Sequence, residues 1–381
     1  MPDTAEPLDA VVVGAGWTGL AVLHLLRGRG LRVRAYDTAG NVGGTWWWHA
    51  FPGSHLDVDS ALYQYFFDED LYREWGWSER YPAGYEVQRW FRFAADRLGL
   101  RRDVRLSTTV TDATRDADGW TLRTDRGEVV RTRALVACTG RGSVEPDVDV
   151  SAFGGLVLRT ASWREDRHDL RGRRVGVLGS GTSAIQLVPA VVDAVAALTV
   201  VADRPRDVVP RVNPLYGWPE REAYRARFAE LRDAPHDPPP APDRDGMRAR
   251  LPAEPRLATL LVPDGEPDGV VRDGGWLEAF TCPHVELLAA GDLARVGPDG
   301  LELADGSARP LDMLVVADQP DAGPPASGRF GPDVLTPTRT PPGTAPCVHL
   351  YREAHRLADE VAAALPDDRP TTGAPTCASP R

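Results

Sequence analysis

The sequence predicts an α/β protein built from two domains that share an interface. A strand, a glycine-rich turn, a helix and a second strand follow one another over residues 9 to 37, and the same order returns over residues 173 to 203. Length supports two domains, because single hydrophobic cores seldom keep growing beyond about 250 to 300 residues and this chain has 381.

The first unit reads DAVVVGAGWTGLAVLHLLRGRGLRVRAYD and places Gly14, Gly16 and Gly19 between an apolar β-branched run and a helical pattern. Glycines at this spacing let the chain turn tightly, so that the amino terminus of the helix approaches a pyrophosphate, whose charge the free amides and the helix dipole favour. Asp37 closes the second strand, where it is placed to accept a hydrogen bond from a ribose hydroxyl. The unit predicts a dinucleotide site; the competing interpretation is a glycine turn that only precedes a buried helix.

The second unit, RRVGVLGSGTSAIQLVPAVVDAVAALTVVAD, repeats the design, and we expect its turn to bind a second nucleotide through Gly179, Gly181, Thr182 and Ser183. Two such units imply two nucleotides, or one site and a structural copy. The repeat favours a flavoenzyme that is reduced by a nicotinamide cofactor. Its strand ends in Asp203, an acid typical of NADH sites, but an arginine cluster follows at once. We expect Arg204 to contact the 2′-phosphate of NADPH, with NADH as the alternative.

These units divide the chain into two Rossmann-like domains of the FAD/NAD(P)-binding, two-domain flavoprotein type. Residues 1–150 are predicted to form the first part of the FAD-binding domain, and residues 151–310 the NAD(P)-binding domain. Within the second domain, residues 233–246 are rich in proline and charge, which is typical of an exposed linker. Residues 311–381 are expected to return to the FAD-binding domain through the strand DMLVVAD, an amphipathic helix over 348–365 and a disordered tail.

Composition excludes several classes of partner. The formal charge of −11 argues against a surface for nucleic acid, which is bound chiefly through positive charge. All 44 basic residues are arginine, so phosphates must be held by arginine or by backbone amides. The eight histidines show no metal-ligand spacing, and we expect no metal.

The cellular setting is inferred from the cysteines and from hydropathy. The four cysteines show no C-x-x-C spacing, and the chain opens without a charged, apolar, cleavable leader. We therefore expect a cytoplasmic protein. No apolar run approaches the roughly 20 residues that a bilayer requires, so we expect no membrane partner. The chain is expected to act as a monomer or homodimer.

The stretch GGTWWWHAFPGSHLD fits the pattern [AG]-G-x-W-x-x-x-x-[FY]-P-[GM]-x-x-x-D at every specified position, from Gly43 to Asp57. A second fingerprint, F-x-G-x-x-x-H-x-x-x-W, matches FGGLVLRTASW except that Arg159 stands at the histidine position. With both, the chain resembles the type I Baeyer–Villiger monooxygenases within the class B flavin monooxygenases. It resembles them over roughly residues 9 to 215, and it is short after that point.

The resemblance implies that NADPH reduces FAD and that the reduced flavin adds oxygen to form a C4a-(hydro)peroxyflavin. This species then oxidises a carbonyl or a soft heteroatom, here in a small ketone or lactam-like compound of specialised metabolism. Gly44, Thr45, Trp46 and Gly140 are then expected beside the flavin. Asp57 is expected to pair with an arginine that stabilises the peroxide anion.

The three consecutive tryptophans suggest a wall that keeps water from the flavin. Trp46 is favoured because the motif specifies it, and Trp47, Trp48, His49, His55 and Tyr63 are expected to line the substrate pocket. The alternative is that the tryptophans fill core between the domains, as large aromatic side chains often do.

The pattern fails where the family's arginine is expected, because Gly269 stands there and Asp268 occupies the usual basic position. Either Arg272 or Arg159 would then supply the positive charge. Without a cation, the peroxide would be protonated and electrophilic. The runner-up reaction is therefore oxygenation of nitrogen, sulfur or carbon. Another hypothesis is a degenerate FAD-binding protein, which Asp318 in place of a threonine also favours.

Overall fold

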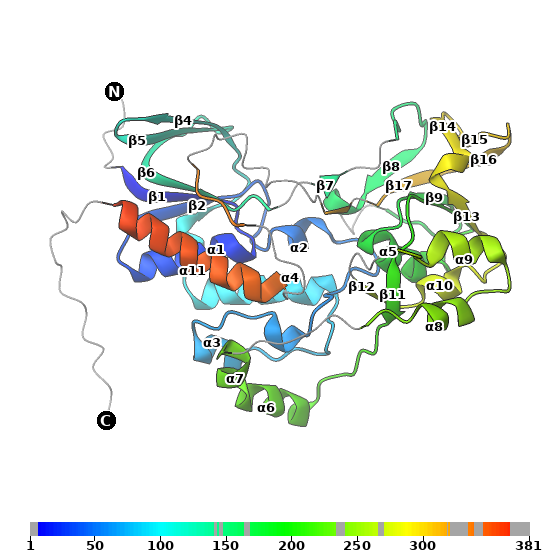
Figure 1. Ribbon diagram of the computed structural model, residues 1–381. Coiled ribbons are helices and arrows are strands. Elements are labelled where there is room, and N and C mark those ends of the chain that lie inside the picture. Colours follow the sequence, from blue (N-terminus) through cyan, green and yellow to red (C-terminus); the bar gives the residue numbers. More distant parts are fainter. Residues whose placement is uncertain are drawn as a thin grey trace.

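The computed structural model describes residues 7–140, 143–144, 148–163, 168–233, 241–265, 270–317, 319–320, 334–338 and 346–365. These ranges contain two main β-sheets that stand side by side, each covered by helices, with the short helix α2 (Thr45–Trp48) between them (Figure 1). This arrangement confirms the predicted α/β class with two domains.

The first domain is built on a six-stranded sheet in the order β3-β2-β1-β6-β5-β4. Its strands are β1 (Leu8–Val13), β2 (Val33–Tyr36), β3 (Val104–Arg105), β4 (Val110–Asp116), β5 (Gly119–Thr124) and β6 (Val129–Ala137). The first three and β6 run parallel, whereas β4, β5 and β6 pair antiparallel. The central strand β1 is almost entirely apolar, which suits a strand buried on both faces.

Helices α1 (Trp17–Gly28) and α11 (Pro346–Ala364) pack against each other in the first domain (Figure 1). The second of these confirms the amphipathic helix expected over residues 348–365. Helices α3 (Glu69–Glu74) and α4 (Gly84–Arg97) complete the covering layer. Aromatic rings fill the core, and the ring of Trp17 stacks on that of Trp90 with centroids 5.2 Å apart.

The second domain is built on a five-stranded sheet in the order β13-β10-β9-β17-β8, in which every pairing is parallel. Its strands are β8 (Leu156–Arg159), β9 (Arg174–Leu178), β10 (Ala197–Ala202), β13 (Val285–Ala289) and β17 (Met313–Val316). Helix α5 (Thr182–Val191) connects β9 to β10, as the second glycine unit predicted.

The strand DMLVVAD does not return to the first domain, so the predicted boundary at residue 310 is wrong. β17 pairs with β9 on one side and with β8 on the other, inside the second sheet. An apolar strand that is buried on both faces fits the interior of either parallel sheet, and its sequence does not say which. Among the described residues, the return to the first domain is seen at Leu335, which bridges Val136 of β6, and in α11.

Part of the predicted second domain packs on the first. Helices α6 (Trp218–Ala226) and α7 (Phe228–Asp233) contribute Tyr224, Phe228 and Leu231 to the first hydrophobic core. Of the stretch expected as an exposed linker, the structure describes residue 233, at the end of α7, and residues 241–246. There helix α8 (Arg244–Ala249) begins, and Arg244 forms an ion pair of 2.8 Å with buried Asp207.

Smaller elements complete the second half of the chain. They are β7 (Ser143–Val144) with β18 (Gln319–Pro320), β11 (Asp207–Pro210) with β12 (Val270–Asp273), the meander of β14 (Leu293–Gly297), β15 (Gly300–Leu303) and β16 (Ala308–Pro310), and the helices α9 (Pro255–Leu261) and α10 (Trp276–Ala279). In the described part of the chain, no helix has the length and apolar character needed to cross a membrane.

Candidate active site

The first glycine turn lies where the chain passes from β1 into α1. Gly14 has a φ of +106°, and a Cβ atom there would lie 2.3 Å from the carbonyl oxygen of Cys138. A Cβ on Gly19 would lie 1.9 Å from the carbonyl oxygen of Gly14. Gly16 caps the 12-residue helix. The turn therefore excludes side chains, and its backbone can approach a pyrophosphate at the helix start.

Asp37 braces this turn from the end of β2. One carboxylate oxygen accepts a hydrogen bond from the amide of Ala15 at 2.5 Å, and the other accepts from the amide of Ala39 at 2.8 Å. Burial raises the pKa of Asp37, while these two amides lower it. Each oxygen keeps a second lone pair for a further donor. The ribose contact stays a prediction.

The aromatic signature begins against the same turn. The amide of Gly43 donates to the carbonyl oxygen of Ala15 at 2.9 Å. Gly44 has a φ of +54°, and a Cβ atom on it would lie 2.9 Å from the Cα of Gly16. Two glycine backbones thus touch, and this contact places exposed Thr45 and the tryptophans of α2 next to the start of α1.

The three tryptophans are half-buried and make different contacts. The indole nitrogen of Trp46 donates to the hydroxyl of Tyr63 at 2.8 Å. Trp47 packs over Gly40, where its ring lies 3.1 Å from the position of a Cβ. Tyr63 is buried in the first core, with its ring centroid 4.6 Å from that of Trp17. Core packing thus covers most of the Tyr63 ring, and its place in the lining of a substrate pocket stays a prediction.

A hydrogen-bond network joins the two domains at Asp57. The side-chain amide of Gln186, on α5, donates to a carboxylate oxygen of Asp57 at 2.8 Å and to the carbonyl oxygen of His55 at 3.0 Å. Its amide oxygen accepts from the backbone nitrogen of His55 at 3.2 Å. One glutamine of the second domain thus fixes the end of the aromatic signature.

The positive charges of Arg211 and Arg272 interact with the carboxylate of Asp57. Loss of solvation raises the pKa of Asp57 to about 6, and Gln186, Arg211 and Arg272 oppose this rise. As a residue, Asp57 nevertheless remains exposed at the surface. Burial lowers the pKa of Arg211, which Asp57 in turn raises.

The positions of both arginines are fixed by the strand pair β11 and β12. The backbone amide of Arg211 donates to the carbonyl of Asp273 at 2.8 Å. The guanidinium of Arg272 lies 4.9 Å from the centroid of the Tyr81 ring, a cation–π distance. Buried Asp273 accepts hydrogen bonds from the amides of Gly275 and Trp276 at the start of α10 and pairs with Arg250 at 3.0 Å, which anchors this corner.

Burial lowers the pKa of both histidines of the signature. His49 forms a β-bridge with Trp163, and burial lowers its pKa to about 4. His55 contacts the carbonyl oxygen of Gly53 through Nδ1 at 2.5 Å, and burial lowers its pKa as well. Arg159 ends β8, four residues before Trp163, on the second-domain side of that bridge.

The second glycine turn repeats the geometry of the first. Gly179 has a φ of +111°, and a Cβ there would lie 2.9 Å from the carbonyl oxygen of Ala317. Gly181 caps α5, which starts at Thr182, and Ser183 is buried in its first turn. The hydroxyl of Ser180 lies 2.6 Å from a carboxylate oxygen of Asp203.

The side chains of Asp203 and Arg204 beside this turn are exposed to solvent. Arg204 extends beside Asp203 with Nε 3.9 Å from its carboxylate, and about half of the Arg204 side chain is exposed. An exposed guanidinium next to the strand end suits a phosphate ester. Gly140, which follows β6, has a φ of +72° and open space at its Cβ position. Gly269, Asp268 and Asp318 lie outside the described residues.

Sequence reasoning missed two residues of this site. Gln186 is a polar side chain inside the apolar helix TSAIQLVPAV, and that exception was the available signal. Arg211 was noticed only as a member of an arginine cluster beside the second nucleotide. Its proximity to Asp57 depends on contacts between segments more than 150 residues apart, which local patterns do not reveal.

Comparison with known proteins agrees with this geometry. A family model described as an NAD(P)-binding Rossmann-like domain matches residues 12–73. An acetone monooxygenase (methyl acetate-forming) of Gordonia sp. is 36% identical over 85% of this chain and 72% of its own length. A Baeyer–Villiger monooxygenase of Pseudooceanicola batsensis is 39% identical over 53% of this chain, and a phenazine N-monooxygenase of Lysobacter antibioticus is 38% identical over 59%. The matched regions span only 38% and 42% of those two relatives.

Among solved structures, a steroid monooxygenase bound to NADP superposes with a TM-score of 0.81 and 29% identity. The superposition covers 94% of this chain and 86% of that one. The sequence signature, the paired glycine turns and these matches agree. The chain therefore belongs to the Baeyer–Villiger family of flavin-dependent monooxygenases, whose members use FAD and NADPH.

Proposed function

We propose that this chain uses FAD and NADPH to insert one oxygen atom of O2 beside the carbonyl of a small ketone or lactam-like metabolite. The reaction balances as ketone, O2, NADPH and a proton giving ester, water and NADP⁺. The observation that carries the proposal is the cluster of Asp57, Gln186, Arg211 and Arg272, which both domains build beside the aromatic signature.

The two glycine turns fit the two nucleotides. The first turn has no room for side chains and meets the signature through Gly16 and Gly44, so we assign FAD to it. The second turn carries the exposed Arg204 beside Asp203, so we assign NADPH to it. Bound FAD would supply the transfer of two electrons from NADPH to O2.

The cluster at Asp57 supplies positive charge at a fixed place. Gln186 orients the carboxylate, and the carboxylate attracts Arg211 and Arg272. Fixed cations stabilise negative charge that develops during oxygen transfer, and they are most effective where water is scarce. We therefore assign to Arg211 and Arg272 together the role that the family gives to the arginine missing at residue 269.

The test is turnover by the purified, flavin-loaded protein. With NADPH, O2 and a panel of small ketones, we expect esters or lactones whose mass exceeds that of the substrate by one oxygen atom. Arg211→Gln and Arg272→Gln should each lower kcat by about tenfold or more. The matched control is Arg295→Gln, which removes an exposed arginine paired with Glu302. Failure to oxygenate any ketone, with amines or sulfides turned over instead, would overturn the assignment.

Oxygenation of nitrogen or sulfur is the second candidate, supported by the likeness to a phenazine N-monooxygenase. It predicts that Arg211→Gln and Arg272→Gln leave amine turnover intact, because an electrophilic oxygen donor does not need a stabilised anion. Parallel assays of ketones, amines and sulfides on these variants separate the two reactions.

The third candidate is a flavoprotein without efficient oxygenation. It predicts that NADPH oxidation yields hydrogen peroxide in equal amount and no oxygenated product from any member of the panel. Measuring peroxide, NADPH and product in one reaction distinguishes it from both enzymes.

A further inference from the structure

Residues 78–83 of the first domain lie against the segment that carries Asp57. The amide of Leu56, the residue before Asp57, donates to the carbonyl oxygen of Pro82 at 2.9 Å. Tyr81, the residue before Pro82, is buried, with only 3% of its surface exposed. The backbone of Tyr81 is therefore held in a fixed place relative to the backbone of Asp57.

One side chain from the segment that follows β11 holds the backbone of Tyr81. The amide oxygen of Asn213 accepts a hydrogen bond from the amide of Tyr81 at 2.7 Å, and the side-chain nitrogen donates to the carbonyl oxygen of Tyr81 at 3.2 Å. The same nitrogen donates to the carboxylate of Glu79 at 2.8 Å. Because Asn213 lies two residues after Arg211, these contacts tie Tyr81 to the strand pair β11 and β12.

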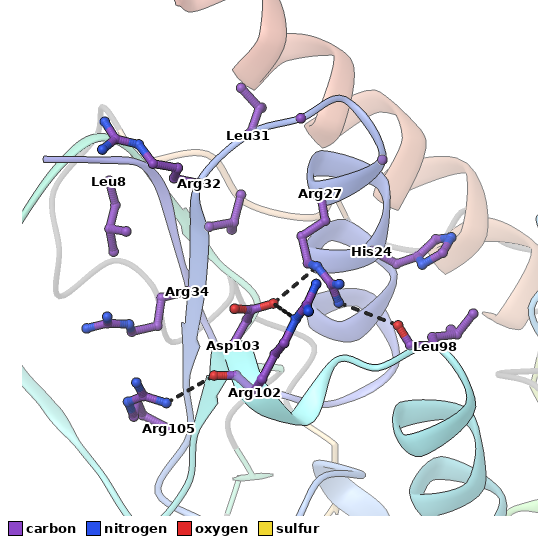
Figure 2. Close-up of a pocket in the computed structure, with 13 residues that line it drawn as sticks. Leu8, His24, Arg27, Leu31, Arg32, Arg34, Leu98, Arg102, Asp103 and Arg105 are labelled. Carbon is purple, nitrogen blue, oxygen red and sulfur yellow. Dashed lines mark hydrogen bonds and ion pairs between the residues drawn. The ribbon is translucent and has the colours of Figure 1, made fainter. Parts of the chain in front are cut away.

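The ring of Tyr81 contacts the guanidinium of Arg272. An arginine is commonly oriented by a carboxylate, as Figure 2 shows for Arg27, which pairs with Asp103 at 3.1 Å. Arg272 is placed over an aromatic face instead, with its guanidinium carbon 4.9 Å from the centroid of the Tyr81 ring. Such a face attracts a cation without neutralising its charge, and it leaves the N–H edge of the guanidinium to other groups.

We propose that Tyr81 and Asn213 are positioning residues for Arg272. Asn213 fixes the backbone of Tyr81, and the ring of Tyr81 holds the guanidinium of Arg272 beside Asp57 with its charge preserved. This inference rests on the proposed function, in which Arg272 stabilises negative charge during oxygen transfer.

Arg80 is the other cation beside this ring. Its guanidinium carbon lies 5.3 Å from the Tyr81 centroid, and its Nε lies 2.9 Å from the carboxylate of Asp59. Charge-assisted hydrogen bonds are among the strongest that side chains make. Loss of the ring should therefore displace Arg272 more than Arg80.

The first test compares two changes of the ring in the flavin-loaded protein. Tyr81→Leu removes the aromatic face and should lower kcat for ketones by about tenfold, as Arg272→Gln does. Tyr81→Phe keeps the face and should keep kcat within about twofold. The KM for NADPH should be unchanged in both, because neither variant alters the second glycine turn. An equal loss of kcat in Tyr81→Phe would overturn the proposal.

Double-mutant cycles distinguish positioning from packing. Tyr81→Leu with Arg272→Gln should lower kcat no further than either change alone. Half-buried Asn213 provides a second cycle that keeps the ring, and Asn213→Ala with Arg272→Gln should likewise be less than additive. Arg80→Gln is the control, and we expect it to leave kcat nearly unchanged. Additive losses in both Arg272 cycles overturn the proposal.

Thermal denaturation of the same variants reports the contact without turnover. The loss of melting temperature in Tyr81→Leu with Arg272→Gln should be smaller than the sum of the single losses. Tyr81→Leu with Arg295→Gln, which alters an exposed arginine of the second domain, should be additive. If the unaltered protein oxygenates no ketone, the proposed function fails, whereas coupling in this cycle still supports the contact of the ring with Arg272. Additive losses with Arg272→Gln here overturn that contact.

Discussion

The two glycine turns share one pattern but differ in how the protein encloses them. In both, the residue after the first glycine donates its amide to the acid that ends the following strand: Ala15 to Asp37 at 2.5 Å, and Ser180 to Asp203 at 3.1 Å. The backbone of Gly44 packs closely against Gly16 of the first turn. The second has an exposed edge, where the Asp203 side chain is 41% accessible.

The third position of each pattern shows the same contrast. Gly19 has no space for a Cβ atom, whereas the equivalent Ala184 is a buried core residue of α5. The first turn is therefore packed more tightly than the second.

The largest expected effect comes from Gly19→Ala. Its methyl group would meet the carbonyl oxygen of Gly14 at 1.9 Å, so the helix must shift, and we expect a loss of about 3 kcal/mol in the free energy of unfolding. Flavin content and thermal denaturation measure the outcome. The matched change Ala184→Gly should cost only about 1 kcal/mol. Full flavin content and an unchanged melting temperature in Gly19→Ala would show that the first turn has room for a side chain at residue 19.

Gln186→Ala tests the connection between the two turns. It leaves the Asp57 carboxylate and both backbone groups of His55 without this partner, and we expect a loss of about 1 to 3 kcal/mol in the free energy of unfolding. Activity should fall as well, because Asp57 loses its orientation. Gln186→Glu keeps the size of the side chain but adds a negative charge, which should raise the pKa of Asp57. Unchanged stability and turnover in Gln186→Ala would contradict the role of this residue.

Arg204→Gln tests whether exposed Arg204 binds the 2′-phosphate of NADPH at the second turn. We expect the KM for NADPH to rise by about tenfold, with kcat and the KM for NADH nearly unchanged, because only NADPH carries the 2′-phosphate. Steady-state assays with the two cofactors measure this ratio. Arg171→Gln, remote from the turn, serves as the control. An equal rise in both KM values would mean that Arg204 does not read the phosphate.

The smallest effect is a shift in pH dependence. The pKa of Asp57 is raised to about 6 by loss of solvation, and Arg211 lowers it. A raised pKa means that the contribution of Asp57 to stability is present below about pH 4 and lost as the pH rises through about 6. If the ionised form supports turnover, kcat/KM falls below about pH 6.

Profiles of kcat/KM against pH measure this limb. Arg211→Gln should move it to higher pH, and Asp57→Asn should remove it. An acid limb that persists in Asp57→Asn belongs to another group.

Sequence patterns were sufficient for both glycine turns because strand, turn and helix signals lie within 30 consecutive residues. They also predicted α11, whose apolar positions recur with helical period. They did not assign β17 to its sheet, because the sequence of an apolar strand does not indicate which strands pair with it. Nor did they place Tyr63 in the core or bring Gln186 and Arg211 to Asp57, since those contacts depend on how distant segments pack.

The hydrogen bonds of Gln186 to the segment around Asp57 limit how the two domains can move relative to each other. Gln186 lies one helical turn after the start of α5, next to the second glycine turn. Its side chain makes three hydrogen bonds to the segment around Asp57 in the first domain. Any rotation of the second domain against the first would therefore have to carry this segment along, or break all three hydrogen bonds. The position of the Asp57 carboxylate would in this way depend on the position of the domain that we propose binds NADPH.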